Sequence, residues 1–69
     1  MKLDVFIDIR DRIDSRTLWN RLEDTGINVT DLGTHTLVYG TIEQKDLTRT
    51  IATCQEFGDS IATISPPRH

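Results

Sequence analysis

The sequence predicts an α+β domain in which four strands and two helices follow one another in the order βαββαβ. Three observations support this prediction. The first residues alternate between polar and apolar side chains, two later stretches have apolar residues at helical spacing, and glycines fall where each helix should end. At 69 residues the chain has room for one domain, which we place at residues 1–65.

The first predicted element is a strand from Lys2 to Ile9. Its apolar side chains share one parity and are Leu3, Val5, Ile7 and Ile9. The other parity carries Lys2, Asp4, Phe6 and Asp8. A period of two is typical of a strand with one buried face. We therefore expect Phe6 on the uncovered face, between two aspartates.

A helix is predicted to follow the first strand after a short charged loop, with Asp14 as its N-cap. Ile13 and Leu18 then have the spacing of a hydrophobic staple around that cap. The helix is expected to continue to about Thr25, and Gly26 supplies the left-handed residue that ends it.

A β-hairpin is predicted next. Its strands are expected at Ile27–Leu32 and Thr36–Gly40, and the turn at Gly33 and Thr34.

The second helix is predicted from a capping box, in which Thr41 caps the helix and Gln44 reaches back to the Thr41 amide. The helix is expected to continue to about Phe57 and to end at Gly58. Its apolar face is formed by Leu47, Ile51 and Cys54.

A last strand is predicted from Ser60 to Ile64. Pro66 and Pro67 cannot donate ladder hydrogen bonds, so residues 66–69 are expected to be a tail. One fold dominates this element order, the ferredoxin-like plait. In it, two split βαβ units interleave into a four-stranded antiparallel sheet with both helices on one face. The first and third strands are then central, and the other face is open to solvent or to a partner.

Charge and hydropathy narrow the classes of partner. Eleven Asp and Glu against eight Lys and Arg give a net charge of -3, which opposes the counterion release that drives nucleic-acid binding. No apolar stretch approaches the roughly 20 residues needed to span a bilayer. The early acids Asp4 and Asp8 interrupt any signal-peptide core. We therefore expect no nucleic-acid partner, no membrane association and a cytoplasmic location.

The small size of the chain predicts self-association. At this length only about 60% of the surface of the unfolded chain is buried, and such domains usually gain stability from disulfides, metals or oligomerisation. One cysteine excludes an internal disulfide, and two histidines are too few for a closed zinc site. We therefore expect no metal and no cofactor, and we expect a homo-oligomer, either a dimer or a tetramer.

The open face of the sheet is predicted to carry an apolar patch that another subunit covers. Phe6 lies on this face, and the sequence leaves open which side chains of the third strand join it: Leu37 and Tyr39, or Thr36 and Val38. We take Phe6, Val38 and Tyr39 as candidate interface residues. Two exposed aromatic residues on central strands are typical of an RNA-recognition motif, but the aspartates beside Phe6 would repel phosphates.

The loop from Arg10 to Ser15 is the candidate ligand site, with Arg10, Arg12, Asp14 and Ser15 as ligand-binding residues. A helix N-terminus presents free amides to an anion, and the two arginines lie close by. The alternative interpretation is a solvated, self-neutralising cluster, because arginines and aspartates alternate here. An acylphosphatase-like enzyme on this plait would use Arg12 and Asn28, but the glycine-rich phosphate cradle is missing. No catalytic residue is assigned.

The passage Leu22-Glu23-Asp24-Thr25-Gly26-Ile27-Asn28-Val29 resembles the helix-to-strand passage of ACT-type regulatory domains. Those domains share the βαββαβ order, so the resemblance covers nearly the whole chain. In that family, small effectors such as amino acids bind where the loop after the first strand meets the second strand of a neighbouring subunit. The resemblance implies ligand-binding positions at Arg10, Arg12, Asp14 and Asn28. ACT loops usually carry a glycine where this loop has Ile13-Asp14-Ser15.

These features predict a non-enzymatic, ACT-like regulatory or ligand-sensing module that acts as a homo-oligomer and binds a small anionic ligand. The alternative hypothesis is a protein-interaction subunit that docks on a larger enzyme and has no ligand of its own. The third is an acylphosphatase-like hydrolase.

Overall fold

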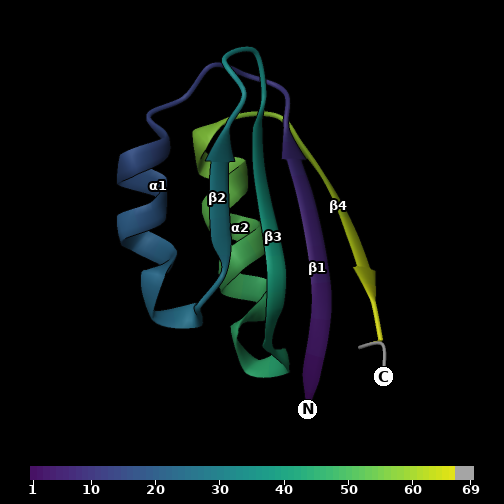
Figure 1. Cartoon of the computed structure of the whole chain (residues 1–69). Coiled ribbons are helices and arrows are strands. Elements are labelled where there is room, and N and C mark those ends of the chain that lie inside the picture. The colour runs from purple at the N-terminus through teal and green to yellow at the C-terminus, as the bar shows by residue number, and fades with distance from the viewer. Residues whose placement is uncertain (67–69) are drawn as a thin grey trace.

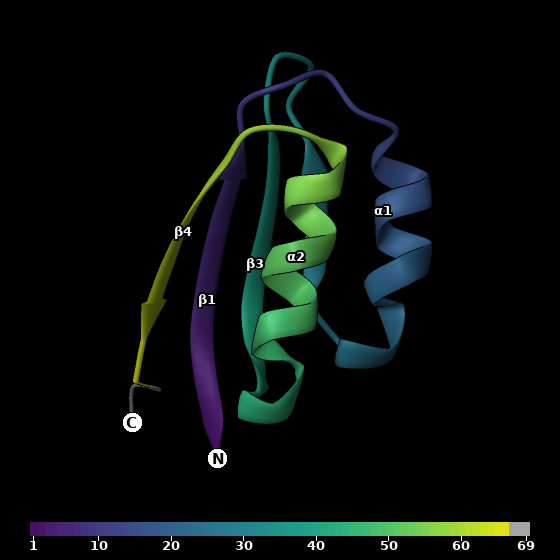
Figure 2. The same cartoon turned by 180° about the vertical axis from the view of Figure 1, so that it is seen from behind.

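The structure is a computed structural model that describes residues 1–66. It has one antiparallel sheet of four strands, with two α-helices on one face of the sheet (Figure 1 and Figure 2). The strands are β1 (Lys2–Ile9), β2 (Asn28–Asp31), β3 (Thr36–Glu43) and β4 (Ser60–Ser65). The helices are α1 (Ser15–Leu22) and α2 (Leu47–Phe57), with the short 3-10 helices η1 (Glu23–Thr25) and η2 (Gln44–Asp46). The predicted α+β class is therefore confirmed.

The strands lie in the order β2-β3-β1-β4, so β1 and β3 are central, as predicted. All eight residues of β1 pair with β3, from Lys2 opposite Glu43 to Ile9 opposite Thr36. On its other side β1 pairs with β4. The two edges of the sheet are the four-residue strand β2 and the six-residue strand β4.

The core lies between the sheet and the two helices. The alternation predicted for β1 is confirmed, because Val5, Ile7 and Ile9 are buried whereas Phe6 is exposed. The buried apolar residues of the described chain are Val5, Ile7, Ile9, Leu18, Leu22, Ile27, Val38, Ile42 and Cys54. Leu18 and Leu22 are the contribution of α1, one helical turn apart on the inward face.

Both predicted ends of α1 are confirmed. Asp14 is the N-cap, since its Oδ1 accepts a hydrogen bond from Thr17 N at 3.2 Å. After the regular turns of α1, η1 continues the helical path to Thr25. Gly26 then has φ 78°, a left-handed conformation that a residue with a Cβ adopts only at a cost.

The predicted capping box at Thr41 is wrong. Thr41 lies inside β3, opposite Asp4 of β1, and its hydroxyl donates to Asp4 Oδ1 at 2.6 Å. Strand β3 continues past Thr41 because β1 pairs with it as far as Lys2, which lies opposite Glu43. Gln44 N still donates to Met1 O at 2.8 Å just beyond the strand. The helix α2 begins at Leu47, after η2.

The parity of β3 is now defined. Val38 is fully buried against the helices, together with Thr36 and Ile42. Its candidate role as an interface residue is therefore wrong for this fold, because its side chain is part of the core. Tyr39 has the opposite parity and lies on the open face, directly opposite Phe6.

The last strand continues one residue beyond its predicted end, to Ser65. Of the predicted tail, Pro66 follows β4 without regular structure, and residues 67–69 lie outside the described part of the chain.

Candidate functional site

The open face of the sheet has an aromatic centre. Phe6 and Tyr39 are paired across the two central strands, and 46% and 38% of their surfaces are exposed. The Tyr39 hydroxyl lies 3.1 Å from Thr30 Oγ1 of β2, which holds the ring over the face. Ile61 of β4 has the same parity as Phe6, since it pairs with Asp8, and is 56% exposed. The three side chains make this face a surface that is apolar at its centre.

Acidic side chains surround the aromatic pair. Asp4 and Asp8 of β1 and Glu43 of β3 share the parity of Phe6 and Tyr39. Lys2 of β1 has this parity too and lies opposite Glu43. Each of the three acids has one short contact: Asp4 with Thr41, Glu43 with the Met1 amino group at 3.5 Å, and Asp8 with His35. No Lys or Arg side chain within residues 1–66 forms an ion pair with any of the three. The open face therefore combines an apolar centre with a rim in which Asp4, Asp8 and Glu43 outnumber Lys2, and we call this rim acidic.

The contact between His35 and Asp8 was missed by sequence reasoning. His35 Nδ1 lies 3.0 Å from Asp8 Oδ1. The contact arises because the hairpin closes through a bond from Leu32 N to His35 O at 2.8 Å, which places His35 next to the end of β1. No local pattern in the sequence signals it, since the two residues are 27 positions apart.

The aspartates of the predicted ligand loop fasten the loop to the fold. Asp14 caps α1, and Asp11 Oδ2 accepts a hydrogen bond from Asp59 N at 2.9 Å. Arg10 N in turn donates to Asp59 O at 2.9 Å. The loop after β1 is thus tied to the loop that joins α2 to β4.

The two arginines of this loop are exposed, and neither forms an ion pair with a described residue. Ser15 is the first residue of α1. Asn28 lies far from this loop. It pairs with Tyr39, and Tyr39 pairs with Phe6. Phe6 precedes Arg10 by four residues along β1. At about 3.3 Å per residue this separation is roughly 13 Å along the strand direction alone. Within one chain, the structure does not bring Arg12 and Asn28 together, and residues 1–66 form no pocket between them.

The Asp14 cap predicts a pH-dependent contribution to stability. Hydrogen bonds from the Thr17 side chain and main chain hold the pKa of Asp14 below its usual value of 3.8. A carboxyl with a lowered folded-state pKa stabilises the fold above its unfolded-state pKa, and this contribution is lost as the pH falls through the folded value. We expect Asp14→Ala to lower the melting temperature by a few degrees at neutral pH, with a difference from wild type that shrinks in acid below pH about 4.

The matched control is Asp14→Asn. Asparagine is an equally good N-cap but does not titrate. Thermal unfolding of Asp14→Asn should therefore lie near wild type at neutral pH, and its difference from Asp14→Ala should not shrink in acid. A gap between wild type and Asp14→Ala that stays constant from neutral pH into acid would contradict the role of the ionised carboxylate.

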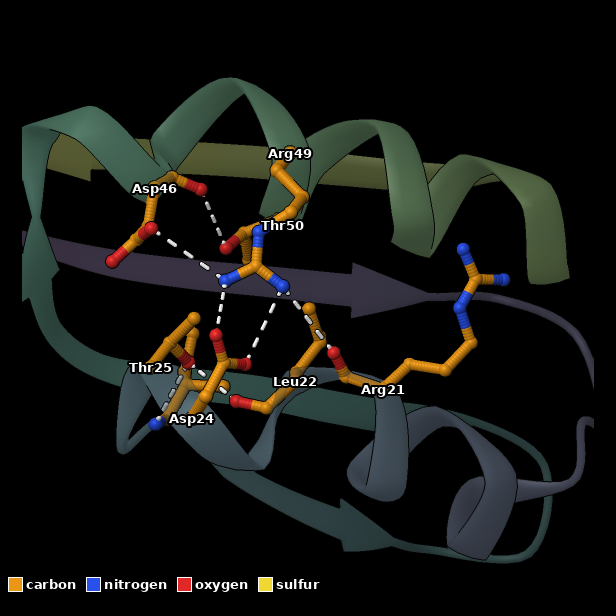
Figure 3. Close-up of polar contacts among 8 residues, drawn as sticks. Arg21, Leu22, Asp24, Thr25, Asp46, Arg49 and Thr50 are labelled. Atoms are coloured by element: carbon orange, nitrogen blue, oxygen red, sulfur yellow. Dashed lines mark hydrogen bonds and ion pairs between the residues drawn. The ribbon is translucent and has the colours of Figure 1, made fainter.

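A second polar cluster joins the two helices and is structural (Figure 3). Arg49 of α2 donates to both carboxylate oxygens of Asp24, with the shorter bond at 2.8 Å, and to Arg21 O at 3.4 Å. The same guanidinium lies 3.5 Å from Asp46 Oδ1. Arg21 forms a second bridge between the helices, to Glu56 at 3.2 Å. These arginines are occupied by internal partners, unlike Arg10 and Arg12.

The described residues contain no candidate metal site and no reactive thiol. Residues 1–66 contain no cluster of three or more metal-ligating side chains. Cys54 is buried, as its place on the apolar face of α2 predicts, and burial raises the pKa of its thiol to about 11. The ionised form that nucleophilic chemistry requires is therefore scarce at neutral pH.

Neither helix in this part of the chain has the length and apolar character needed to cross a membrane.

No protein-family model and no curated protein matches this chain.

Proposed function

We propose that this chain is a non-enzymatic protein-interaction module with a ferredoxin-like fold, and that the open face of its sheet binds a partner protein. The observation that carries the proposal is the exposed pair of Phe6 and Tyr39 at the centre of a sheet face that no helix covers. Aromatic side chains are enriched at the centres of protein interfaces, where they provide a large contact area with few rotatable bonds.

The strand order supports the fold assignment. Read from the other edge, the order is β4-β1-β3-β2. Two interleaved βαβ units produce this order, because β3 then lies between β1 and β2, and β1 lies between β3 and β4. Both helices cover the same face of the sheet (Figure 1 and Figure 2). The aromatic pair lies on the opposite face, because its parity is opposite to that of the buried strand residues.

The acidic rim defines the chemistry of the partner. Asp4, Asp8 and Glu43 outnumber Lys2 around the apolar centre, so the complementary surface is apolar with Lys or Arg side chains opposite these acids. A second copy packed face to face would bring two acidic rims together, and like charges across an interface are unfavourable. We therefore propose a different protein as the occupant of this face, in place of the second subunit that the sequence suggests.

Affinity capture with matched variants tests this function. The bait is the full chain, and the lysate is that of the source organism. Phe6→Ser combined with Tyr39→Ser removes the aromatic centre, whereas Trp19→Ser removes an equally exposed aromatic residue from α1. We expect a protein that wild type and Trp19→Ser recover and the double variant does not, with recovery that falls as salt is raised.

The double variant should remain folded, because both of its side chains are exposed, and circular dichroism checks this. Equal recovery of the same proteins by all three baits would contradict the proposal. So would recovery that is lost with Trp19→Ser and kept with the double variant.

A second candidate function is the ACT-like sensing of a small anion at the loop after β1. The observation that favours it is the contrast between Arg10 and Arg12, which pair with no described carboxylate, and the internally paired Arg21 and Arg49. In this arrangement Asn28 would come from a second copy. Inorganic phosphate or an amino acid should then raise the melting temperature of wild type in a dose-dependent way, and Arg12→Gln should abolish the shift.

A further inference from the structure

Within its own residues, the strand β4 carries none of the side chains that usually protect an outer edge against pairing, and Pro66 follows it directly. Its six residues, Ser60–Ser65, include no charged residue, glycine or proline, and five of the six are exposed. Natural sheets protect their edges with charged side chains, prolines, bulges or short strands. The other edge of this sheet follows that rule, since β2 has only four residues and ends in Asp31. The contrast indicates that β4 pairs with another strand.

We propose that two copies of this chain pair antiparallel through β4, about a two-fold axis that passes through Ala62. The two four-stranded sheets then form one continuous sheet. This proposal concerns an edge of the sheet and is independent of what binds its open face.

One hydrogen bond shows which residues of β4 direct their main-chain N–H and C=O groups toward β1 and which direct them outward. Arg10 N donates to Asp59 O, so these two residues occupy a hydrogen-bonded position of the antiparallel ladder between β1 and β4. Such positions alternate with positions whose main-chain groups point to the other side. The N–H and C=O groups that point away from β1 are therefore those of Ser60, Ala62 and Ile64.

One register uses all of these groups. With Ala62 opposite Ala62 of the second copy, Ser60 lies opposite Ile64 and Ile64 opposite Ser60. Every outward N–H of β4 then has an acceptor. A shift of two residues toward the C-terminus would place Pro66 in the ladder, where it has no N–H to donate. A shift of one residue would turn the side chains to the wrong faces.

The side chains also fit this register. Ala62 is small, which suits the position where two copies meet on the axis. On the open face, Ile61 lies opposite Thr63 of the second copy, and pairs of β-branched residues across strands are favourable. On the helical face, Ile64 is 40% exposed at the edge and gains a neighbour. Arg49 of α2 faces α1. Ile51 follows it by two residues, which is about 200° around the helix. Ile51 therefore points away from α1, toward the β4 edge.

A second copy fits this edge better than a charged peptide strand. The edge is uncharged, so it offers a charged strand no electrostatic complement, whereas it complements its own sequence in the register above. The acidic residues of the open face do not oppose the pairing, because they lie on β1 and β3 and not on β4. The open faces of the two copies lie on the same side of the joint sheet, so the dimer presents two aromatic patches side by side.

Analytical ultracentrifugation of the full chain tests the dimer. Wild type is expected at twice the 7.9 kDa mass of one chain at micromolar concentration. Ala62→Lys places two ammonium groups at the axis and should weaken dimerisation by roughly tenfold or more, since like charges directly opposite each other are destabilising. The control Asn20→Lys adds the same charge to an exposed position of α1 and should leave the dimer intact. A monomeric wild type would overturn the proposal, and so would loss of the dimer in Asn20→Lys alone.

Cysteine trapping tests the register and remains informative if Ala62→Lys is poorly folded. Two Cα atoms at a hydrogen-bonded antiparallel position lie about 5.5 Å apart, within the range of a disulfide. Oxidised glutathione should therefore convert Ala62→Cys into a covalent dimer, with two thiols oxidised to one disulfide and glutathione disulfide reduced to two glutathione thiols. Ile64→Cys should form far less, because the two introduced thiols lie four residues out of register. Equal trapping at both positions, or none at Ala62→Cys, would refute this pairing.

Discussion

Replacing Ile7 with alanine is expected to lower the free energy of unfolding by about 2 to 5 kcal/mol. Ile7 is fully buried at the centre of the sheet, between Val38 of β3 and Ala62 of β4. Its truncation removes apolar contacts and leaves a cavity that neighbouring strands cannot close. A domain of this length has a total stability of only about 3 to 10 kcal/mol, so the variant should lose a large share of it and unfold at a clearly lower urea concentration than wild type.

Urea denaturation followed by circular dichroism measures this effect. Two control variants are compared with it. Ile7→Val, a smaller truncation at the same site, should cost about 0.5 to 1.5 kcal/mol. Leu32→Ala, a truncation at an exposed site, should change the free energy of unfolding by less than about 0.5 kcal/mol. Leu32 is 58% exposed, so its truncation opens no cavity. All variants must be compared at one protein concentration, because dimerisation would add to the apparent stability. A loss for Ile7→Ala as small as that for Leu32→Ala would contradict the burial of this side chain.

Local signals in the sequence predicted the elements that depend on neighbouring residues. The alternation of β1, the Asp14 cap and the left-handed Gly26 each involve residues within one or two turns of one another, and the structure contains all three. The capping box at Thr41 failed because it competes with a partner far away in sequence. Strand β1 pairs with β3 as far as Glu43, and the pairing with Asp4 keeps Thr41 extended.

The open face was predictable only in part. The parity of β1 places Phe6 outside from the sequence alone. The parity of β3 was ambiguous because Thr36 and Val38 are as compatible with a buried face as Leu37 and Tyr39 are. The tertiary fold decides it, since the helices cover Val38. That decision brings Tyr39 next to Phe6 and turns one exposed aromatic residue into a pair.

The exposed edge at β4 was the least predictable feature. The element order places β4 at an edge, but the direction of its main-chain groups depends on the ladder phase, which the Arg10 to Asp59 bond reveals. The partners of the aspartates in the predicted ligand loop were also not predictable from the sequence. Its aspartates read as part of a charge cluster in the sequence, yet Asp11 and Asp14 have separate structural partners.

Replacing Gly58 with alanine is expected to lower the free energy of unfolding by about 1 to 3 kcal/mol, the range for forcing an extra methyl into a packed site. A Cβ at this position would lie 2.5 Å from Asp11 Oδ2 and 2.9 Å from Asp11 Cβ. The Asp11 side chain would have to move, and it would give up its hydrogen bond with Asp59 N. Crowding causes this loss, since the extended backbone of Gly58 suits any residue.

A double-mutant cycle isolates this mechanism. In an Asp11→Gly background no side chain remains to meet the new methyl group, so Gly58→Ala should cost much less there than in wild type. The effect of glycine at position 11 on the unfolded chain cancels, because it is present on both sides of that comparison. Urea denaturation of the four proteins gives the coupling energy between the two positions. Equal costs of Gly58→Ala in both backgrounds would show that Asp11 does not lie against this glycine, and that the loop after β1 is held in some other way.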